Sequence, residues 1–174
     1  MPVQLTKWIQ QSFRDHPEWA TVSDLADRLL ARLNAETTLT LIEAANRPTA
    51  SSADVQEALR PVAESLGFQS ERRGLFLDSI PGLRPDYYQW IDGSGIVLEV
   101  ERGKTTTNNM DLLDFWKCHL CPSAHYLFLL VPQALRHNPD MTPKREFESV
   151  SRRLGTFFEP RNYTNVRGLC LFGY

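Results

Sequence analysis

The chain has few cysteines and no long apolar run, and each absence excludes a class of protein. Three cysteines among 174 residues are too few, and odd in number, for a disulfide framework, so they suit a reducing compartment. No apolar stretch approaches the roughly 18 residues that a membrane span needs. The N-terminus also lacks a basic segment followed by an apolar stretch and a small-residue cleavage site. We therefore expect a cytoplasmic protein with no membrane partner.

The chain also lacks a strong excess of either charge, since 19 Lys and Arg face 21 Asp and Glu. The charges are unevenly distributed along the chain. Residues 1–66 carry nine acids and six bases, whereas residues 139–174 carry four acids and six bases. A protein of this charge has no global attraction to nucleic acid, but its basic C-terminal segment leaves a phosphate ligand open.

The N-terminal part of the chain carries two helical patterns and a clear boundary. Apolar residues at helical spacing predict one helix from Leu5 to Phe13 and another from Val22 to Leu33. The turn-rich run Arg47–Ser52 then interrupts the pattern. We therefore predict an N-terminal helical extension over residues 1–50 and a core domain over residues 51–174.

The remaining elements alternate between helix and strand. In order, they are a helix over 53–66, strands over 68–73 and 75–80, a hairpin over 84–104, a helix from Asn108 to before Pro122, a strand over 126–131, a helix from Thr142, and a strand over 166–172. The strand at 126–131 is apolar on both faces, which is typical of a strand covered by helices on both sides. This order predicts an α/β fold with a mixed central β-sheet flanked by helices.

The helix predicted before Pro122 carries two patterns of interest. Its expected buried stripe consists of Leu112, Leu113, Trp116 and Leu120. At its end, Cys118-His119-Leu-Cys121 together with His125 has the form of half a zinc site. No second Cys pair follows at the usual distance, so we expect apolar packing of these cysteines instead.

Three carboxylates are concentrated in the hairpin RPDYYQWIDGSGIVLEVERGK, residues 84–104. Side chains alternate along a strand, so Glu99 and Glu101 point to the same face. A two-residue loop at Asp92-Gly93 places Asp86 opposite Glu99, and a four-residue loop places it opposite Glu101. Both of these registers bring the three acids to one face of the sheet, whereas a loop of three or five residues would turn Asp86 to the reverse face.

Acids this close repel one another unless they are protonated or bridged by cations. Carboxylate oxygens suit Mg²⁺ or Mn²⁺, which would make the hairpin a metal site. The alternative is pairing across the sheet with basic residues, of which Arg72, Arg73, Arg84 and Arg102 are available. Glu99 favours the metal site, because it interrupts an apolar strand and a buried acid without a role is costly.

Pro85-Asp86 and Glu99-Val-Glu101 resemble the signature of the PD-(D/E)xK nuclease superfamily, a Pro-Asp on one hairpin strand and an acid-x-Lys on the next. The resemblance covers residues 53 to 132, including the helix before the hairpin, the helix after it and the buried strand. It implies a restriction-endonuclease-like core for the domain. It also implies a nuclease that depends on Mg²⁺ or Mn²⁺.

The chain departs from that signature at one position, where Glu101 stands in place of the Lys, as in a minority of restriction-type members. Lys104 is one candidate for the missing role, because Gly103 favours a bulge that would re-aim the next side chain. The alternative is that Lys104 is a solvated strand end.

The resemblance also implies roles for the acids. Asp86 and Glu99 would hold the metal ion, while Glu101 would complete the ligand set or accept a proton from the attacking water. A Glu on the preceding helix joins the metal site in many members. Glu57 and Glu64 are both candidates here, and we favour Glu57.

The sequence thus predicts a metal-dependent nuclease that cleaves phosphodiester bonds, with DNA as the expected substrate. The alternative is a nucleic-acid-binding or protein-interaction module that keeps the fold with an inactive site, which would agree with the missing Lys. A small nuclease often needs two copies to reach both strands of a duplex, which suggests a homodimer.

Overall fold

A computed structural model describes residues 1–47, 50–70, 83–103, 105–135 and 142–174. Its centre is a six-stranded sheet in the order β1-β6-β5-β4-β3-β2. The strands are β1 (Gln4–Ile9), β2 (Gln69–Ser70), β3 (Tyr87–Ile91), β4 (Ser94–Val100), β5 (Tyr126–Val131) and β6 (Gly168–Gly173). Strands β4, β5 and β6 are parallel to one another, whereas β1, β3 and β2 each pair antiparallel with their neighbours. The sheet is therefore mixed, as the sequence predicts.

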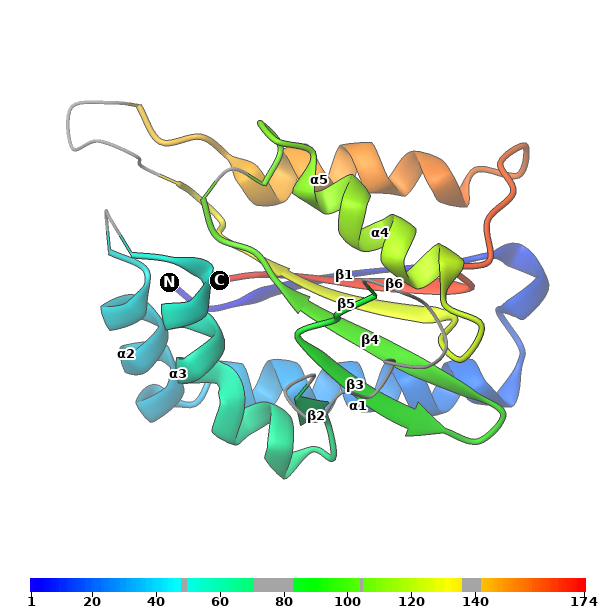
Figure 1. Cartoon of the computed structure of the whole chain (residues 1–174), viewed down its shortest axis with the longest axis horizontal. Coiled ribbons are helices and arrows are strands. Elements are labelled where there is room, and N and C mark those ends of the chain that lie inside the picture. The colour runs from blue at the N-terminus through cyan, green and yellow to red at the C-terminus, as the bar shows by residue number, and fades with distance from the viewer. Residues whose placement is uncertain (48–49, 71–82, 104, 136–141) are drawn as a thin grey trace.

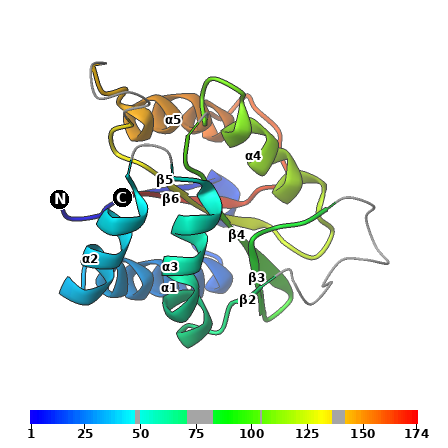
Figure 2. The same cartoon turned by 60° about the vertical axis from the view of Figure 1, so that its left-hand side comes forward.

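Helices cover both faces of this sheet (Figure 1). The helices are α1 (Pro17–Leu33), α2 (Glu36–Ala45), α3 (Ser52–Ser65), α4 (Met110–Leu120) and α5 (Glu146–Gly155), with short 3₁₀ turns η1 (Gln11–Phe13) and η3 (Thr156–Phe158). Helices α1, α2 and α3 lie on one face, and α4 and α5 lie on the other. The same three layers are visible after rotation (Figure 2). The predicted fold class, an α/β sheet flanked by helices, is confirmed.

Alternation along the central strands divides the core into two layers. On β5, Phe128 and Leu130 pack with α1, α2 and α3, whereas Leu127 and Leu129 pack with α4 and α5. All six residues of β5 are buried, as expected for a strand that is covered on both faces. The face to which a β4 side chain points therefore decides which helices it meets.

The helix predicted from Leu5 to Phe13 is wrong, because residues 4–9 form strand β1. This strand pairs antiparallel with β6 along its whole length. Leu5 and Ile9 are four residues apart, a spacing that fits one face of a strand as well as one face of a helix. Pairing with the open edge of β6 satisfies backbone groups that would otherwise remain unpaired. The predicted division of the chain at residue 50 stays a prediction.

Two other predictions concern where a helix begins and how far two strands extend. The helix expected from Thr142 begins at Glu146, since Lys144 instead forms an isolated bridge with Leu135. Of the strands predicted over 68–73 and 75–80, the structure describes only β2, and residues 71–82 lie outside the described part of the chain. Among the helices that the structure describes, none has the length and apolar character needed to cross a bilayer.

Candidate active site

The hairpin of β3 and β4 has a two-residue loop, the first of the two alternatives that the sequence left open. Ile91 pairs with Ser94, so Asp92 and Gly93 form the loop. Gly93 has a φ of +75°, a left-handed conformation that glycine adopts without a steric penalty. Because Tyr87 pairs with Leu98, the next residue back, Asp86, comes to lie opposite Glu99.

Backbone hydrogen bonds hold Asp86 and Glu99 beside each other. The Val100 N–H donates to Asp86 Oδ2 at 2.8 Å, and the Asp86 N–H donates to Glu99 Oε2 at 3.2 Å. Each carboxylate is thus fixed by the backbone of the opposite strand. Glu101 follows on the same face as Glu99, and its own backbone is held by Leu130 and by the Tyr174 hydroxyl.

Two residues of α4, which the sequence did not single out, complete this cluster. Lys117 Nζ lies 3.1 Å from Glu99 Oε1 and 2.9 Å from Asp114 Oδ1. Asp114 is fully buried, and neither of its carboxylate oxygens has a partner with hydrogen-bond geometry, the Lys117 contact included. The structure therefore brings four acids, Asp86, Glu99, Glu101 and Asp114, together around one lysine.

Helix α4 presents these polar side chains because its orientation is the reverse of the predicted one. Its buried residues are Asp111, Asp114, Phe115 and Cys118. Three members of the predicted buried stripe are exposed instead, namely Leu113, Trp116 and Leu120. That prediction was wrong because it counted apolar residues alone. A charged i, i+3 pair, Asp114 and Lys117, was the available signal that this face carries a function.

Contacts with α5 and η3 fix α4 in this orientation. Asp111, in the first turn of α4, accepts a hydrogen bond from Arg153 of α5 at 3.1 Å. The Phe115 ring stacks on Phe157, with ring centroids 4.4 Å apart. Asp111 and Phe115 lie on the same side of the helix as Asp114 and Cys118, so these contacts turn the acid-bearing side toward the sheet.

Burial raises the pKa of every acid in the cluster, and repulsion from neighbouring acids adds to the shift at Asp86, Glu99 and Glu101. Burial raises the pKa of Asp86 to about 6, although the hydrogen bond from Val100 opposes the shift. Burial, with repulsion from Asp114 and then Asp86, raises the pKa of Glu101 to about 8. The pKa values of Glu99 and Asp114 are also raised, chiefly by burial.

Lys117 stays charged in this setting. Burial by itself would lower its pKa, but attraction to Glu99 and Asp114 outweighs burial and raises the pKa above its usual value. A charged ammonium therefore lies among carboxyl groups that have a strong tendency to hold protons. Perturbed groups of this kind concentrate at functional sites.

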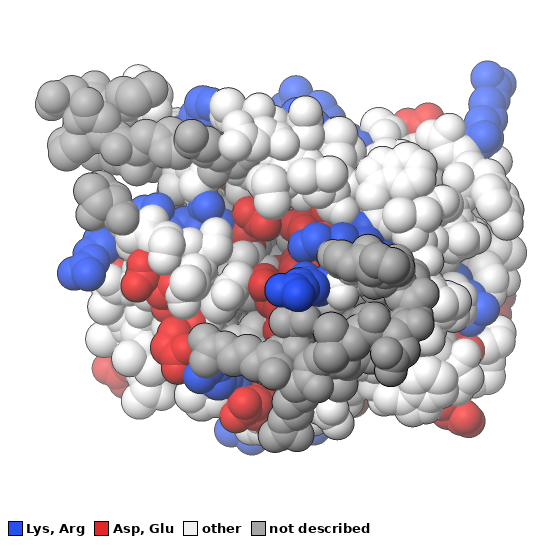
Figure 3. Space-filling view, viewed as in Figure 1, with Lys and Arg blue, Asp and Glu red and all other residues white. Residues whose placement is uncertain are grey.

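The space-filling view shows where such groups reach solvent. Acidic side chains gather in the middle of the face shown, with basic side chains beside them (Figure 3). In the matching cartoon, this is where β4 ends between α3 and α4. Asp86 and Glu101 are partly exposed, whereas Glu99 is only 1% exposed. The cluster thus has a buried end at Glu99 and Asp114 and an accessible end at Asp86 and Glu101.

The donor chemistry of the cluster fits a hard divalent cation. Its carboxylate oxygens are the ligands that Mg²⁺ and Mn²⁺ prefer, and both oxygens of Asp114 are buried without a hydrogen-bond partner. Yet within the described residues no group of three or more His, Cys, Asp or Glu is arranged to hold one ion. The Lys117 ammonium contacts both Glu99 and Asp114. A cation bound at Glu99 would therefore compete with Lys117.

The other predicted site residues are not brought to this cluster. Glu57 is exposed on α3, on the opposite face of the sheet, and forms an ion pair with Arg60. Glu64 is also exposed on α3. Lys104 lies outside the residues that the structure describes. Of the predicted residues, the structure thus gathers Asp86, Glu99 and Glu101.

The alternative zinc site is not assembled either. His125 Nδ1 lies 2.7 Å from Ser94 Oγ, while His119 contacts Thr164 and Asn165. Cys118 and Cys121 are buried within the apolar layer beneath α4 and α5. Burial raises the pKa of both thiols.

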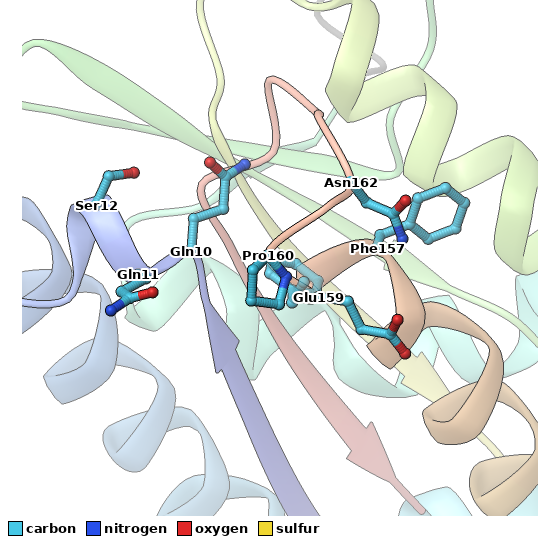
Figure 4. Close-up of a pocket in the computed structure, with 8 residues that line it drawn as sticks. Gln10, Gln11, Ser12, Phe157, Glu159, Pro160 and Asn162 are labelled. Atoms are coloured by element: carbon cyan, nitrogen blue, oxygen red, sulfur yellow. The ribbon is translucent and has the colours of Figure 1, made fainter.

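A cavity of about 420 Å³ lies away from the acid cluster (Figure 4). It is bounded by Gln10, Gln11 and Ser12 after β1, and by Phe157, Glu159 and Asn162 in and after η3. Because β1 runs antiparallel to β6, the end of β1 lies at the start of the parallel strands, opposite the end at which Glu99 stands. The cavity and the acids are therefore separate features.

Comparisons with known proteins leave the family open. No protein-family model and no curated protein matches the chain. Among solved structures, restriction endonuclease BglII in complex with a DNA 16-mer aligns with 99% of this chain and 78% of that chain. The alignment has 11% sequence identity and a TM-score of 0.44. Similarity at this level establishes neither the family nor the activity.

Proposed function

We propose that this protein is a metal-dependent nuclease that hydrolyses phosphodiester bonds, with DNA as its substrate. The convergence of Asp86, Glu99, Glu101 and Asp114 at the end of β4 is the observation that supports the proposal. A hairpin that bears a Pro-Asp and an acid-x-acid, set in a mixed sheet between helices, agrees with the restriction-endonuclease-like core that the sequence resembles.

Asp86 and Glu99 are the proposed ligands of Mg²⁺ or Mn²⁺, and Glu101 or Asp114 would complete the set. When bound, the cation would lower the pKa of an attacking water and polarise the scissile phosphate. The protein supplies a fixed ligand geometry, because the backbone of each hairpin strand holds the carboxylate of the other. Burial and neighbouring acids raise the pKa of Glu101 to about 8, so its carboxylate is a stronger base than an ordinary glutamate once it is ionised, and a bound cation would favour the ionised form.

The decisive experiment is cleavage of plasmid and single-stranded DNA with Mg²⁺ or Mn²⁺, comparing wild type with Asp86→Asn. We expect the variant to lose at least about 100-fold in rate, since it removes a ligand charge from the site. Asp92→Asn is the matched control, because Asp92 is an exposed acid in the loop of the same hairpin. Equal cleavage by wild type and Asp86→Asn would exclude this site.

One observation favours the alternative, a nucleic-acid-binding module with an inactive site. Lys117 already neutralises part of the charge of Glu99 and Asp114 without a metal ion. The alternative predicts DNA binding that requires no divalent cation and no cleavage with either metal. DNA binding should be measured in EDTA and in Ca²⁺. Binding that is equal in the two conditions would agree with the alternative, whereas binding that needs Ca²⁺ would agree with a metal-dependent nuclease, even where cleavage is slow.

A further inference from the structure

We propose that Lys117 of α4 is the catalytic lysine of this site, in place of the lysine that is absent from position 101. The proposal rests on the nuclease function proposed above. Its basis is that Lys117 Nζ lies 3.1 Å from Glu99 and 2.9 Å from Asp114. A residue 18 positions after Glu99 thus delivers to the cluster the positive charge that position 101 does not supply.

The structure holds this ammonium in place from the helix side. Asp114 and Lys117 are three residues apart on α4, so they share one face of the helix. That face is turned to the sheet at the expense of exposing Leu113, Trp116 and Leu120. Exposing apolar side chains while burying an aspartate opposes the usual stability of an amphipathic helix. Such an orientation indicates that the polar pair serves the site.

Arg102, the next basic residue on the hairpin strand, is engaged elsewhere. Its guanidinium donates to Asn46 Oδ1 at 3.1 Å, to the Ala50 carbonyl at 2.5 Å and to the Arg47 carbonyl. These groups belong to the connection between α2 and α3, on the opposite face of the sheet from Lys117. Arg102 therefore ties that connection to the strand and does not supply a charge to the acids.

In the proposed reaction, a water oxygen forms a bond to phosphorus and Glu101 takes the proton of that water. The bond from phosphorus to the leaving oxygen breaks, and that oxygen takes a proton from solvent. The Lys117 ammonium neutralises negative charge that develops on a non-bridging phosphate oxygen. A lysine suits this role because its flexible stem allows the charge to move from a carboxylate to the phosphate.

The test compares Lys117→Met with a matched control, Lys7→Met. Lys7 is 23% exposed and forms an ion pair with Asp27, whereas Lys117 is 29% exposed and pairs with Glu99 and Asp114. The first measurement is single-turnover cleavage with Mn²⁺. We expect Lys117→Met to lose at least about 100-fold in rate and Lys7→Met to stay near wild type. The second is Mn²⁺ affinity by calorimetry, which should be unchanged or tighter in Lys117→Met, because a competing charge is gone.

Cleavage by Lys117→Met close to the wild-type rate would overturn the proposal, and so would a loss of Mn²⁺ affinity that accounts for the lost rate. If Lys117→Met does not fold, Lys117→Gln is compared with Lys117→Arg, which keeps a positive charge on α4. Lys117→Arg should cleave at least about tenfold faster than Lys117→Gln. Equal rates for the two folded variants also overturn the proposal.

The same series separates this proposal from the nuclease function. If Asp86→Asn abolishes cleavage while Lys117→Met retains it, only the role of Lys117 fails. If wild type cleaves no DNA with Mg²⁺ or Mn²⁺, both fail.

Discussion

One face of the sheet packs against α1, α2 and α3 through apolar side chains, whereas the other face, where β4 ends beneath α4, buries carboxylates. Leu98 and Glu99 are neighbours on β4 and are both nearly inaccessible. Leu98 belongs to the apolar layer, and Glu99 meets Lys117 and the buried Asp114. The first face buries apolar side chains, as a stable core ordinarily does. The second face also buries charged side chains, which is unusual for a core. Departures of this kind are expected at functional sites, where stability is given up for chemistry.

The largest effect on stability is expected on the apolar face. Leu98→Ala should lower the free energy of unfolding by about 2–5 kcal/mol, because it removes buried methyl groups and leaves a cavity. Urea unfolding measures this change. The folded variant should keep its Mn²⁺ affinity, since Leu98 points away from the acids. A large loss of metal affinity in folded Leu98→Ala would show that the two faces are not independent.

The opposite result is expected on the charged face. Asp114→Asn should raise the free energy of unfolding at pH 8 by about 1 kcal/mol, because it removes the repulsion that Asp114 exerts on Glu99 and Glu101, while Lys117 keeps its contact with Glu99. Cleavage should fall by about 10–100-fold, since Asp114 holds Lys117 near Glu99. Thermal melting and a cleavage assay together test the trade-off. A variant that is both less stable and fully active would contradict it.

The charged face should also make stability depend on pH. The pKa of Asp86 is raised to about 6 and that of Glu101 to about 8, so both bind protons more tightly when folded than when unfolded. Their stabilising effect is complete below the unfolded values of about 4 and is lost as pH rises through about 6 and then about 8.

Urea unfolding between pH 4 and 9 measures this dependence. Wild type should lose stability with rising pH relative to the double variant Asp86→Asn with Glu101→Gln. The control double variant, Asp92→Asn with Glu148→Gln, changes exposed acids and should give a curve parallel to wild type. Parallel curves for all three proteins would mean that the buried acids titrate normally. Added Mg²⁺ should restore stability more at pH 8 than at pH 5, because a cation binds the ionised carboxylates.

The smallest effect is expected from Glu57→Ala. Glu57 is an exposed side chain on α3, across the sheet from the acids, and its ion pair with Arg60 lies at the surface. The free energy of unfolding should change by at most about 0.5 kcal/mol, and Mn²⁺ affinity should stay within about twofold. A tenfold weaker Mn²⁺ affinity would show that the α3 face contributes to the metal site.

The sequence was sufficient for the parts of the molecule that depend on local periodicity. Alternation along residues 98–101 placed Glu99 and Glu101 on one face. The two-residue Asp92-Gly93 loop, which sets Asp86 beside them, was one of the alternatives and was selected by the structure. The helix from Val22 to Leu33 buries its apolar residues as predicted, within α1. Periodicity failed at Leu5 and Ile9, where a spacing of four residues fits both a strand and a helix.

The position of Lys117 beside the acids could not be predicted from the sequence. The sequence by itself determined that Glu99 and Glu101 share a face of the hairpin, because alternation is a property of neighbouring residues, but it left open the loop length that decides the face of Asp86. Which side of α4 turns toward those acids depends on Arg153 and Phe157, about 40 residues further along the chain. Only the tertiary structure could therefore decide that Asp114 and Lys117, and not the apolar stripe of α4, face the end of β4.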